Sequence, residues 1–501
     1  MTVSFDWIIS SFRSELGAGA PNIAKLSITL GVLELIYTAK EQTACQVDFQ
    51  EDIATCEQTF QEFVDDVKTR LQAGISLETR GKIKLVADLV WSKLSGVFSK
   101  EVLHAQHLST FCQILQAKST KGKRQLDCAG VVTTVLAVLQ QLALLGGHDD
   151  LRRCCLQVSE DHCWINMGLG EREESVEVTT DTAAKRGLAP SEQAWRGWLY
   201  NAGHAVVCSP KMAITALVAS LNPAIVARQN SGIDSEEIQL LQKQLLELIK
   251  REYPEGMYPA ALCALADLQE IEEQDALDSA VSSGSLQEAV SICTRHSTAS
   301  PLGAFEAAIA LADGPEGSSY QWYPYSYICG YLVRRAVFII EHLDCQEAAT
   351  RLLQDAGRWL GNGGGASVLR KYRYTSADGE LYKDIEGVIE GYCGALAWLQ
   401  KKQWPLTSAH LVPLLELWDG VCCLFEHTSK PSNWLNHLLR AMKLFTAEMR
   451  ADAASHARVS SKAMTSAAHL WGSLKPAPLK MIFGAADVEE DVGRATKRPK
   501  R

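Results

Sequence analysis

The sequence lacks the cysteine patterns that mark a disulfide framework or a metal site. Its 15 cysteines contain no C-x-x-C motif, and their number is odd. The N-terminal stretch carries Asp6 where a secretory signal needs an unbroken apolar core, so no signal peptide is predicted. We expect reduced, buried thiols in a cytosolic or nuclear protein. His104 and His107 share a helix face without further nearby ligands, so no metal is expected.

Long apolar runs and phosphate-binding motifs are missing as well. The most apolar stretch, residues 130–147, contains two threonines and two glutamines, and a buried helix fits it better than a membrane span. The glycine-rich residues 361–365 follow a predicted helix and are not followed by Gly-Lys-Ser/Thr, which predicts a loop. We therefore expect no cofactor and no membrane partner.

Positive charge is scarce except at the C-terminus. The chain has 49 Lys+Arg against 59 Asp+Glu, a net charge of −10, which argues against a dedicated nucleic-acid-binding protein. Residues 494–501 hold five cations and no acid. The run Lys497, Arg498, Lys500 and Arg501 fits a nuclear-localisation patch, with at most weak, non-specific contact with DNA phosphates.

Helical periodicity dominates, and only 15 prolines interrupt it. The pattern predicts a mainly α, multi-domain protein in five parts: a helical domain at 1–75, a mixed α+β domain at 76–210, stacked helix pairs at 211–402, further helices at 403–475 and a flexible tail at 476–501. Short alternating runs predict a sheet with strands at 156–158, 164–167, 176–180 and 205–208. The expected helices include 83–98, 129–145, 234–252, 258–272, 323–343, 408–426 and 432–450.

The helix pairs at 211–402 resemble a tetratricopeptide stack. Tyr258-Pro259 and Tyr323-Pro324 each open a predicted helix, and proline suits a first helical turn. Their spacing is close to twice the roughly 34-residue period of such repeats, although the repeat consensus is absent.

Cys128, His162 and Asp181 form the first candidate site. Cys128 follows a predicted Asp127 N-cap at the start of the apolar helix, where the helix dipole stabilises a thiolate. His162 is predicted on a strand, and Asp181 follows the strand at 176–180. This is the order of residues in papain and transglutaminase-like folds. Two interpretations stay open: an active cysteine hydrolase or acyltransferase, or a scaffold that keeps the fold without the activity.

Tyr323, Tyr327, Glu380 and Asp384 form the second candidate site. Each pair lies one turn apart on one helix face. An aromatic groove with an acidic end would bind an extended, arginine-containing peptide. The alternative is that the tyrosines are core packing and the carboxylates form a solvated face.

At these residues the chain resembles the menin family over nearly its whole length. The matching blocks lie, in order, at 156–164, 221–223, 258–268, 323–331, 380–383 and 418–422. The resemblance implies an N-terminal helical domain, a transglutaminase-like thumb, a tetratricopeptide-like palm and helical fingers. It also implies a nuclear scaffold or adaptor, of the tumour-suppressor type, without catalysis.

The same resemblance implies a partner. Family members bind Arg-flanked Phe-Pro segments of mixed-lineage-leukaemia-type histone methyltransferases and of the transcription factor JunD, and so regulate transcription at chromatin through histone methylation. By position, the residues implied to line the thumb–palm cavity are Val158, Asp161, His162, Ser220, Tyr258, Tyr323 and Tyr327. Glu380 and Asp384 would meet the arginines of the ligand.

The chain departs from the family pattern at several cavity positions, where smaller or different residues stand: Ala216, Ala260, Ala264, Ser326 and Leu352. Replacing a large side chain by alanine removes contact worth on the order of 1–3 kcal/mol, which predicts a bulkier peptide or a lower affinity. Cys128 and Asp181 stand where family members carry Ser and His. The triad is therefore more complete here, and the cysteine-hydrolase alternative stays open.

Overall fold

The computed structural model describes most of the chain. The described residues are 5–39, 48–72, 77–94, 96–97, 106–117, 125–159, 162–168, 174–189, 192, 205–221, 235–312, 322–371, 380–424 and 433–460. The predicted tail at 476–501, with its basic run, lies outside them. The expectation of a mainly helical protein is confirmed, and no helix in the described ranges is long and apolar enough to cross a bilayer.

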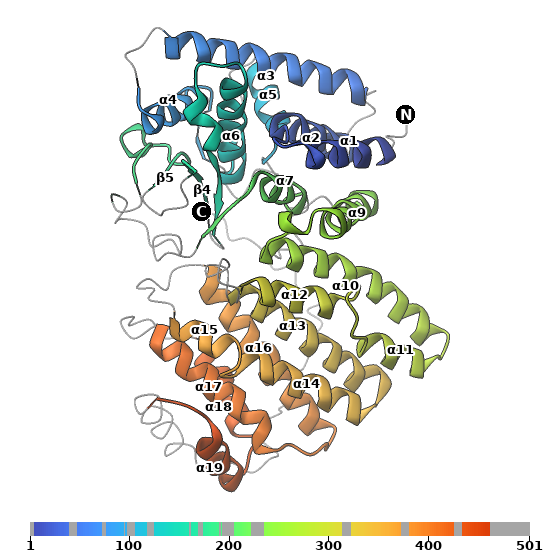
Figure 1. Ribbon diagram of the computed structural model, residues 1–501. Helices are drawn as coiled ribbons and strands as arrows, with labels where there is room; N and C mark the ends of the chain where they lie inside the picture. Colours follow the sequence, from blue (N-terminus) through green and yellow to red (C-terminus); the bar gives the residue numbers. More distant parts are fainter. Residues whose placement is uncertain are drawn as a thin grey trace, which may run out of the picture.

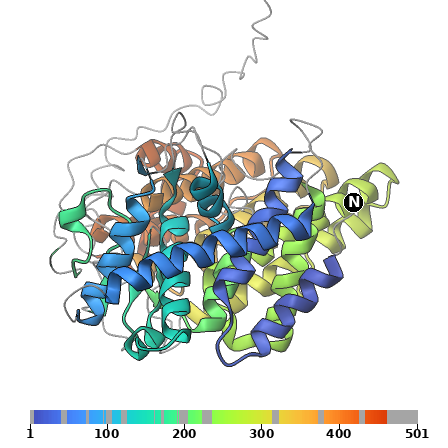
Figure 2. The ribbon, with the colours of Figure 1, turned by 90° about the horizontal axis from the view of Figure 1, so that it is seen from above.

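The N-terminal part consists of α1 (Phe5–Gly17), α2 (Ile23–Ala39), α3 (Phe49–Gln72) and α5 (Leu108–Gln116). The long helix α3 is amphipathic and buries a stripe of side chains that recur every three or four residues, from Ile53 to Leu71. It packs on α2 and α5 and runs across the upper face of the molecule (Figures 1 and 2).

The mixed part combines two helices with two small sheets. Its helices are α4 (Thr79–Trp91) and α6 (Cys128–Leu144), and β1 (Gly96–Val97) pairs in parallel with β2 (Gln125–Leu126). The second sheet contains β3 (Cys155–Val158), β4 (Cys163–Asn166), β5 (Ser175–Val176) and β6 (Val206–Val207). Its order is β5-β4-β3-β6 with every pair antiparallel, and α6 packs against β3 and β4.

Two expectations in this part need correction. The helix predicted at 83–98 ends at Trp91, because the chain turns at Ser92 and Lys93 and then enters β1. The strand predicted at 176–180 pairs only at Ser175–Val176. Beyond Val176 the chain leaves the ladder with β4. The Glu177 amide donates to the Leu188 carbonyl oxygen (3.2 Å), and the Gly187 amide donates to the Glu177 carbonyl oxygen (2.8 Å), before and after the short 3-10 turn Ala183–Lys185.

The next part is a stack of helices. After α7 (Pro210–Ala219) and α9 (Glu236–Glu252) follow α10 (Pro259–Ser282), α11 (Leu286–Cys293), α12 (Pro301–Ala312), α13 (Trp322–Phe338), α14 (Gln346–Leu360), α15 (Gly365–Lys371) and α16 (Glu380–Lys401). A π-helical turn, Ile339–Leu343, extends α13. Because α7 contacts α2 and β3 on one side and α9 and α10 on the other, it joins the mixed part to the stack (Figure 1).

The last described elements are α17 (Ser408–Leu424), α18 (Asn433–Met442) and α19 (Ala447–His456). The single helix predicted at 432–450 is therefore wrong. The chain turns after Met442, and Thr446 starts α19 afresh by accepting a hydrogen bond from the Met449 amide (3.2 Å). The loop predicted at 361–365 is a turn over residues 361–364, and Gly365 already begins α15. Glycine is required at position 364, because a Cβ there would stand 2.1 Å from the Trp359 carbonyl oxygen.

Candidate functional site

A cavity of about 480 Å³ opens where α6, the β3–β4 hairpin and α7 meet. It is lined by four of the residues predicted to bind a peptide, Val158, His162, Ser220 and Tyr258, together with Ala216 and Cys128. Residues from two predicted domains, 76–210 and 211–402, therefore share one concave surface. Its volume lies within the usual range for a ligand pocket.

Cys128 is positioned by the start of helix α6. It is the first helical residue, and the predicted N-cap Asp127 accepts a hydrogen bond from the Gly130 amide at 2.7 Å. The rest of α6 is apolar and buried against the sheet, which fixes the direction of the helix. The thiol is thus held at the positive end of a long helix, half-buried at the cavity wall.

His162 is held at the turn that leads into β4. The Ser159 amide donates to the His162 carbonyl oxygen (2.8 Å), and the His162 amide donates to Ser159 Oγ (3.2 Å). The ring packs edge-on against Trp164, with centroids 4.3 Å apart. The imidazole forms a hydrogen bond with the Cys128 thiol. The structure therefore brings together the first two members of the predicted triad.

The acid beside His162 is Glu177, which the sequence prediction missed. Its carboxylate Oε2 lies 3.6 Å from His162 Nε2 and accepts a hydrogen bond from Trp164 Nε1 (3.1 Å). Thr179 bridges the pair: its hydroxyl lies 2.9 Å from His162 Nε2 and donates to Glu177 Oε1 (2.6 Å). The Glu177 side chain has no exposed surface.

The β4–β5 register explains why these residues meet. Ile165 pairs with Val176 across the antiparallel ladder, so continuing the register sets Trp164 opposite Glu177 and His162 opposite Thr179. Side chains alternate between the two faces of a strand, so these four point to the same side. An acidic residue within a run of valines and threonines was the signal in the sequence.

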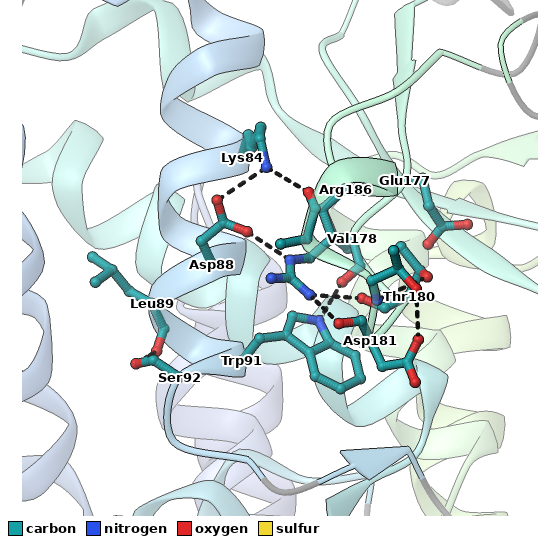
Figure 3. A network of polar contacts seen from close by, with 12 residues as sticks. Lys84, Asp88, Leu89, Trp91, Ser92, Glu177, Val178, Thr180, Asp181 and Arg186 are labelled. Carbon is teal, nitrogen blue, oxygen red and sulfur yellow. Dashed lines mark hydrogen bonds and ion pairs between the residues drawn. The ribbon is translucent and has the colours of Figure 1, made fainter.

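The prediction that Asp181 completes the triad is wrong. Its side chain is exposed and accepts a hydrogen bond from the Thr182 hydroxyl at 3.1 Å. Its backbone is held elsewhere, because Arg186 donates to the carbonyl oxygens of Thr180 and Asp181, both at 3.0 Å, and to Asp88 of α4 at 2.6 Å (Figure 3). Asp181 thus belongs to the anchor of this loop on α4.

The electrostatics of the pair favour an imidazolium facing a carboxylate. Burial by itself would lower the pKa of His162, but hydrogen bonds to Cys128 and Glu177 outweigh burial and raise the pKa to about 9. Burial by itself would raise the pKa of Glu177, but the hydrogen bond and charge of His162 and the bonds from Thr179 leave that pKa lowered. The two groups stabilise each other's charged forms.

This coupling predicts a pH dependence of stability. The pKa of His162 lies above its unfolded value near 6.5, so its contribution is complete below about pH 6.5 and is lost as pH rises through about 9. Glu177 stays ionised throughout, because its pKa is lowered. Urea unfolding should show the stability advantage of the wild type over His162→Gln shrinking between pH 6.5 and 9. A constant difference would contradict this assignment.

Tyr323 and Tyr327 lie together on α13, away from the lining of the first cavity. Their rings meet edge-on with centroids 6.1 Å apart, and Tyr327 stacks on Phe305 at 6.3 Å. Both side chains are half-buried. Tyr327 also lines a second cavity of about 550 Å³ between α10, α13 and α16, where Asp267 and Glu270 supply carboxylates.

The other predicted site residues fall into three groups. Of the family departures, Ala216 lines the first cavity and Ala260 is half-buried, whereas Ala264, Ser326 and Leu352 are buried. Glu380 and Asp384 lie in the first turns of α16, but their side chains are outside the described part. Asp161 and the basic run Lys497, Arg498, Lys500 and Arg501 also lie outside it.

No cluster of three or more potential metal ligands occurs among the described residues. The thiols there are unpaired by disulfides, and most of them are buried. The side chains at the cavity wall supply apolar surface, a thiol and an imidazole, with the Glu177 carboxylate behind the imidazole.

Comparison with known proteins identifies the family. The menin family model matches residues 2–472. Among solved structures, a crystal structure of menin that reveals the binding site for the Mixed Lineage Leukemia (MLL) protein superposes with a TM-score of 0.66. The two sequences are 26% identical, and the match covers 92% of this chain and 94% of that one. With its mainly helical fold and a family match over nearly its full length, the chain belongs to the menin family.

Proposed function

We propose that the chain is a scaffold that binds a linear peptide in the cavity between α6, the β3–β4 hairpin and α7. The observation that carries the proposal is that Val158, His162, Ser220 and Tyr258, from distant parts of the chain, line one cavity of about 480 Å³. Membership of the menin family and the likeness to the menin structure that reveals the MLL binding site support it. Such binding needs no covalent chemistry, so the adaptor role does not depend on catalysis.

The lining of the cavity suits an apolar, turn-forming segment such as Phe-Pro. Leu136, Val158 and Leu217 supply apolar surface, and the Ser220 hydroxyl and the His162 ring supply polar contacts at the edge. Ala216 leaves room where a larger residue would fill the cavity. We therefore propose a peptide with a bulky apolar anchor, of the kind present in mixed-lineage-leukaemia-type histone methyltransferases and JunD-type transcription factors.

Acidic residues would orient the basic flanks of such a peptide. Glu380 and Asp384 stand one turn apart at the start of α16, and paired carboxylates hold an arginine by charge-assisted hydrogen bonds. The proposal extends to regulation of transcription through histone methylation at chromatin. Nuclear localisation is proposed from the run Lys497, Arg498, Lys500 and Arg501.

Filling the cavity should abolish this binding. Ala216→Trp places an indole in the space proposed for the apolar anchor, so the affinity for an Arg-flanked Phe-Pro peptide should fall at least about tenfold, equivalent to about 1.4 kcal/mol. Fluorescence polarisation with a labelled peptide measures the dissociation constant. Leu311→Trp on the exposed surface of α12 is the control and should bind as the wild type does. Unchanged binding by folded Ala216→Trp would sink the assigned cavity.

The acidic end has its own test within the same assay. Glu380→Lys should weaken the Arg-flanked peptide more than a peptide whose arginines are replaced by alanine, because only the first loses a charge pair. Equal losses for both peptides would remove Glu380 from the proposed site and leave the cavity proposal standing on Ala216→Trp.

A further inference from the structure

The peptide-binding proposal makes no use of the buried pair behind the cavity wall. His162 and Glu177 are charged groups with almost no exposed surface, and burying such a pair is expensive unless its geometry is well satisfied. Thr179 and Trp164 satisfy the remaining acceptors of the carboxylate. The hydrogen bond from this pair leads to Cys128, which is open to the cavity.

Three features of Cys128 match those of a cysteine nucleophile. It is the first residue of α6, where unpaired backbone amides favour a negative charge. It is bonded to an imidazole that is itself oriented by a hydroxyl and a carboxylate. It lines a cavity large enough to admit an extended chain.

The other titratable groups of the cavity do not compete with Cys128. Burial raises the pKa of Cys163 well above its usual value, and burial likewise raises the pKa of Tyr258, so both stay neutral. The Asp127 carboxylate is negative and adjacent, but it is engaged by the Gly130 amide at the helix start. Cys128 is thus the thiol at this wall that faces a cationic partner.

We propose that Cys128, His162 and Glu177 form an acyl-transfer site, in which Cys128 is the nucleophile, His162 the general base and acid, and Glu177 with Thr179 the positioning pair. The substrate class is an ester or carboxamide carried on an extended chain that enters the cavity. This goes beyond the peptide-binding function and does not depend on it. Glu177 takes the place that the sequence pattern assigned to Asp181.

The reaction balances with water as the co-reactant. The sulfur of Cys128 attacks the carbonyl carbon as a thiolate whose proton is held on His162, so that an S–C bond forms. The C–O or C–N bond breaks as His162 gives its proton to the leaving alcohol or amine, and a thioester remains on Cys128. Water then attacks the thioester as His162 takes its proton. The C–S bond breaks, the acid leaves and the thiol is restored, with no net oxidation or reduction.

The first test measures activation of the thiol. Alkylation by iodoacetamide at pH 6, followed residue by residue with mass spectrometry, should be about tenfold or more faster at Cys128 than at the exposed Cys423. In Glu177→Gln, which keeps an acceptor for Trp164 but loses the charge, alkylation of Cys128 should slow toward the rate at Cys423. A merely structural role of Glu177 would leave the rate at Cys128 unchanged. Equal rates at Cys128 and Cys423 would overturn the proposal.

The second test measures acyl transfer with p-nitrophenyl acetate as the probe. The full chain should release a burst of one p-nitrophenol per molecule, acetylate Cys128 and then turn over with water or with added glycinamide. Cys128→Ala should lose the burst, and His162→Gln should lose about 100-fold or more in its rate. The control Cys423→Ala should behave as the wild type. An acetyl group that is absent from Cys128, or that persists there without turnover, would overturn the proposal. Binding of the Phe-Pro peptide by the wild type, measured by fluorescence polarisation, reports the scaffold function separately, so a failure of acyl transfer and a failure of peptide binding are distinguishable.

Discussion

Replacing Glu177 by leucine is expected to lower the free energy of unfolding by about 3–5 kcal/mol, because it leaves a buried, charged histidine without its carboxylate. The loss is not confined to His162. Trp164 Nε1 and the Thr179 amide and hydroxyl all donate to Glu177, so three buried donors lose their acceptor together. Denaturant unfolding at pH 7 measures the effect.

Asp181→Ala is the matched control on the same loop. The Asp181 side chain is exposed and bonds only locally to Thr182, so the change should stay within about 0.5 kcal/mol. The loss of unfolding free energy in Glu177→Gln should lie between those of the other two variants, because the amide keeps an acceptor oxygen but removes the charge. If Glu177→Leu lowered the free energy of unfolding no more than Asp181→Ala does, the hydrogen bonds of Glu177 with Trp164 and Thr179 would not be stabilising the fold.

The contrast between these two acids shows how far the sequence could predict the site. The helix that begins at Cys128 and its Asp127 cap follow from local patterns and were predicted correctly. His162 was predicted on a strand, and the structure places it one residue before β4 begins at Cys163. Choosing the third residue requires the β4–β5 register. Glu177, Thr179 and Asp181 share one strand parity, but β5 ends at Val176, and Arg186 ties the backbone at residue 181 to Asp88 of α4.

The fold was predicted best where the helical period is unbroken, as in α6, α9 and α17. It was predicted worst where tertiary contacts end an element. Trp91 closes α4 with its indole bonded to the Val178 carbonyl oxygen (2.7 Å), a partner 87 positions away. The helical period of a sequence reflects residues three or four positions apart, so it cannot indicate a contact between such distant residues. For the same reason the sequence could not show that Tyr258, and not Tyr323, which opens a similar segment, lines the cavity at α6 and α7.

Glu273→Ala is expected to lower the free energy of unfolding by about 3–5 kcal/mol, because it too removes one partner of a buried ion pair. Glu273 on α10 accepts from Tyr331 Oη (2.9 Å) and faces the Arg335 guanidinium at 3.5 Å, both on α13. The Arg335 side chain is only 2% exposed. The guanidinium keeps the Gln274 side chain (3.1 Å) and the Glu270 carbonyl oxygen (3.4 Å) as partners but loses the buried Glu273 carboxylate as a counter-charge.

Glu272→Ala, one residue earlier on α10, separates burial from charge. Glu272 pairs with Lys243 at the surface, where an ion pair contributes about 0–1 kcal/mol, so its removal should barely shift the urea midpoint.

Hydrogen exchange shows where the structure is loosened. In Glu273→Ala the amides of residues 259–282 and 322–338 should exchange faster, because the buried ion pair between α10 and α13 is lost. Since α13 carries Tyr323 and Tyr327, loosening it should also weaken any peptide contact made by the tyrosine pair, while the cavity at α6 and α7 keeps its shape. Equal midpoints for the two variants would mean that the Glu273–Arg335 pair only offsets its own desolvation cost.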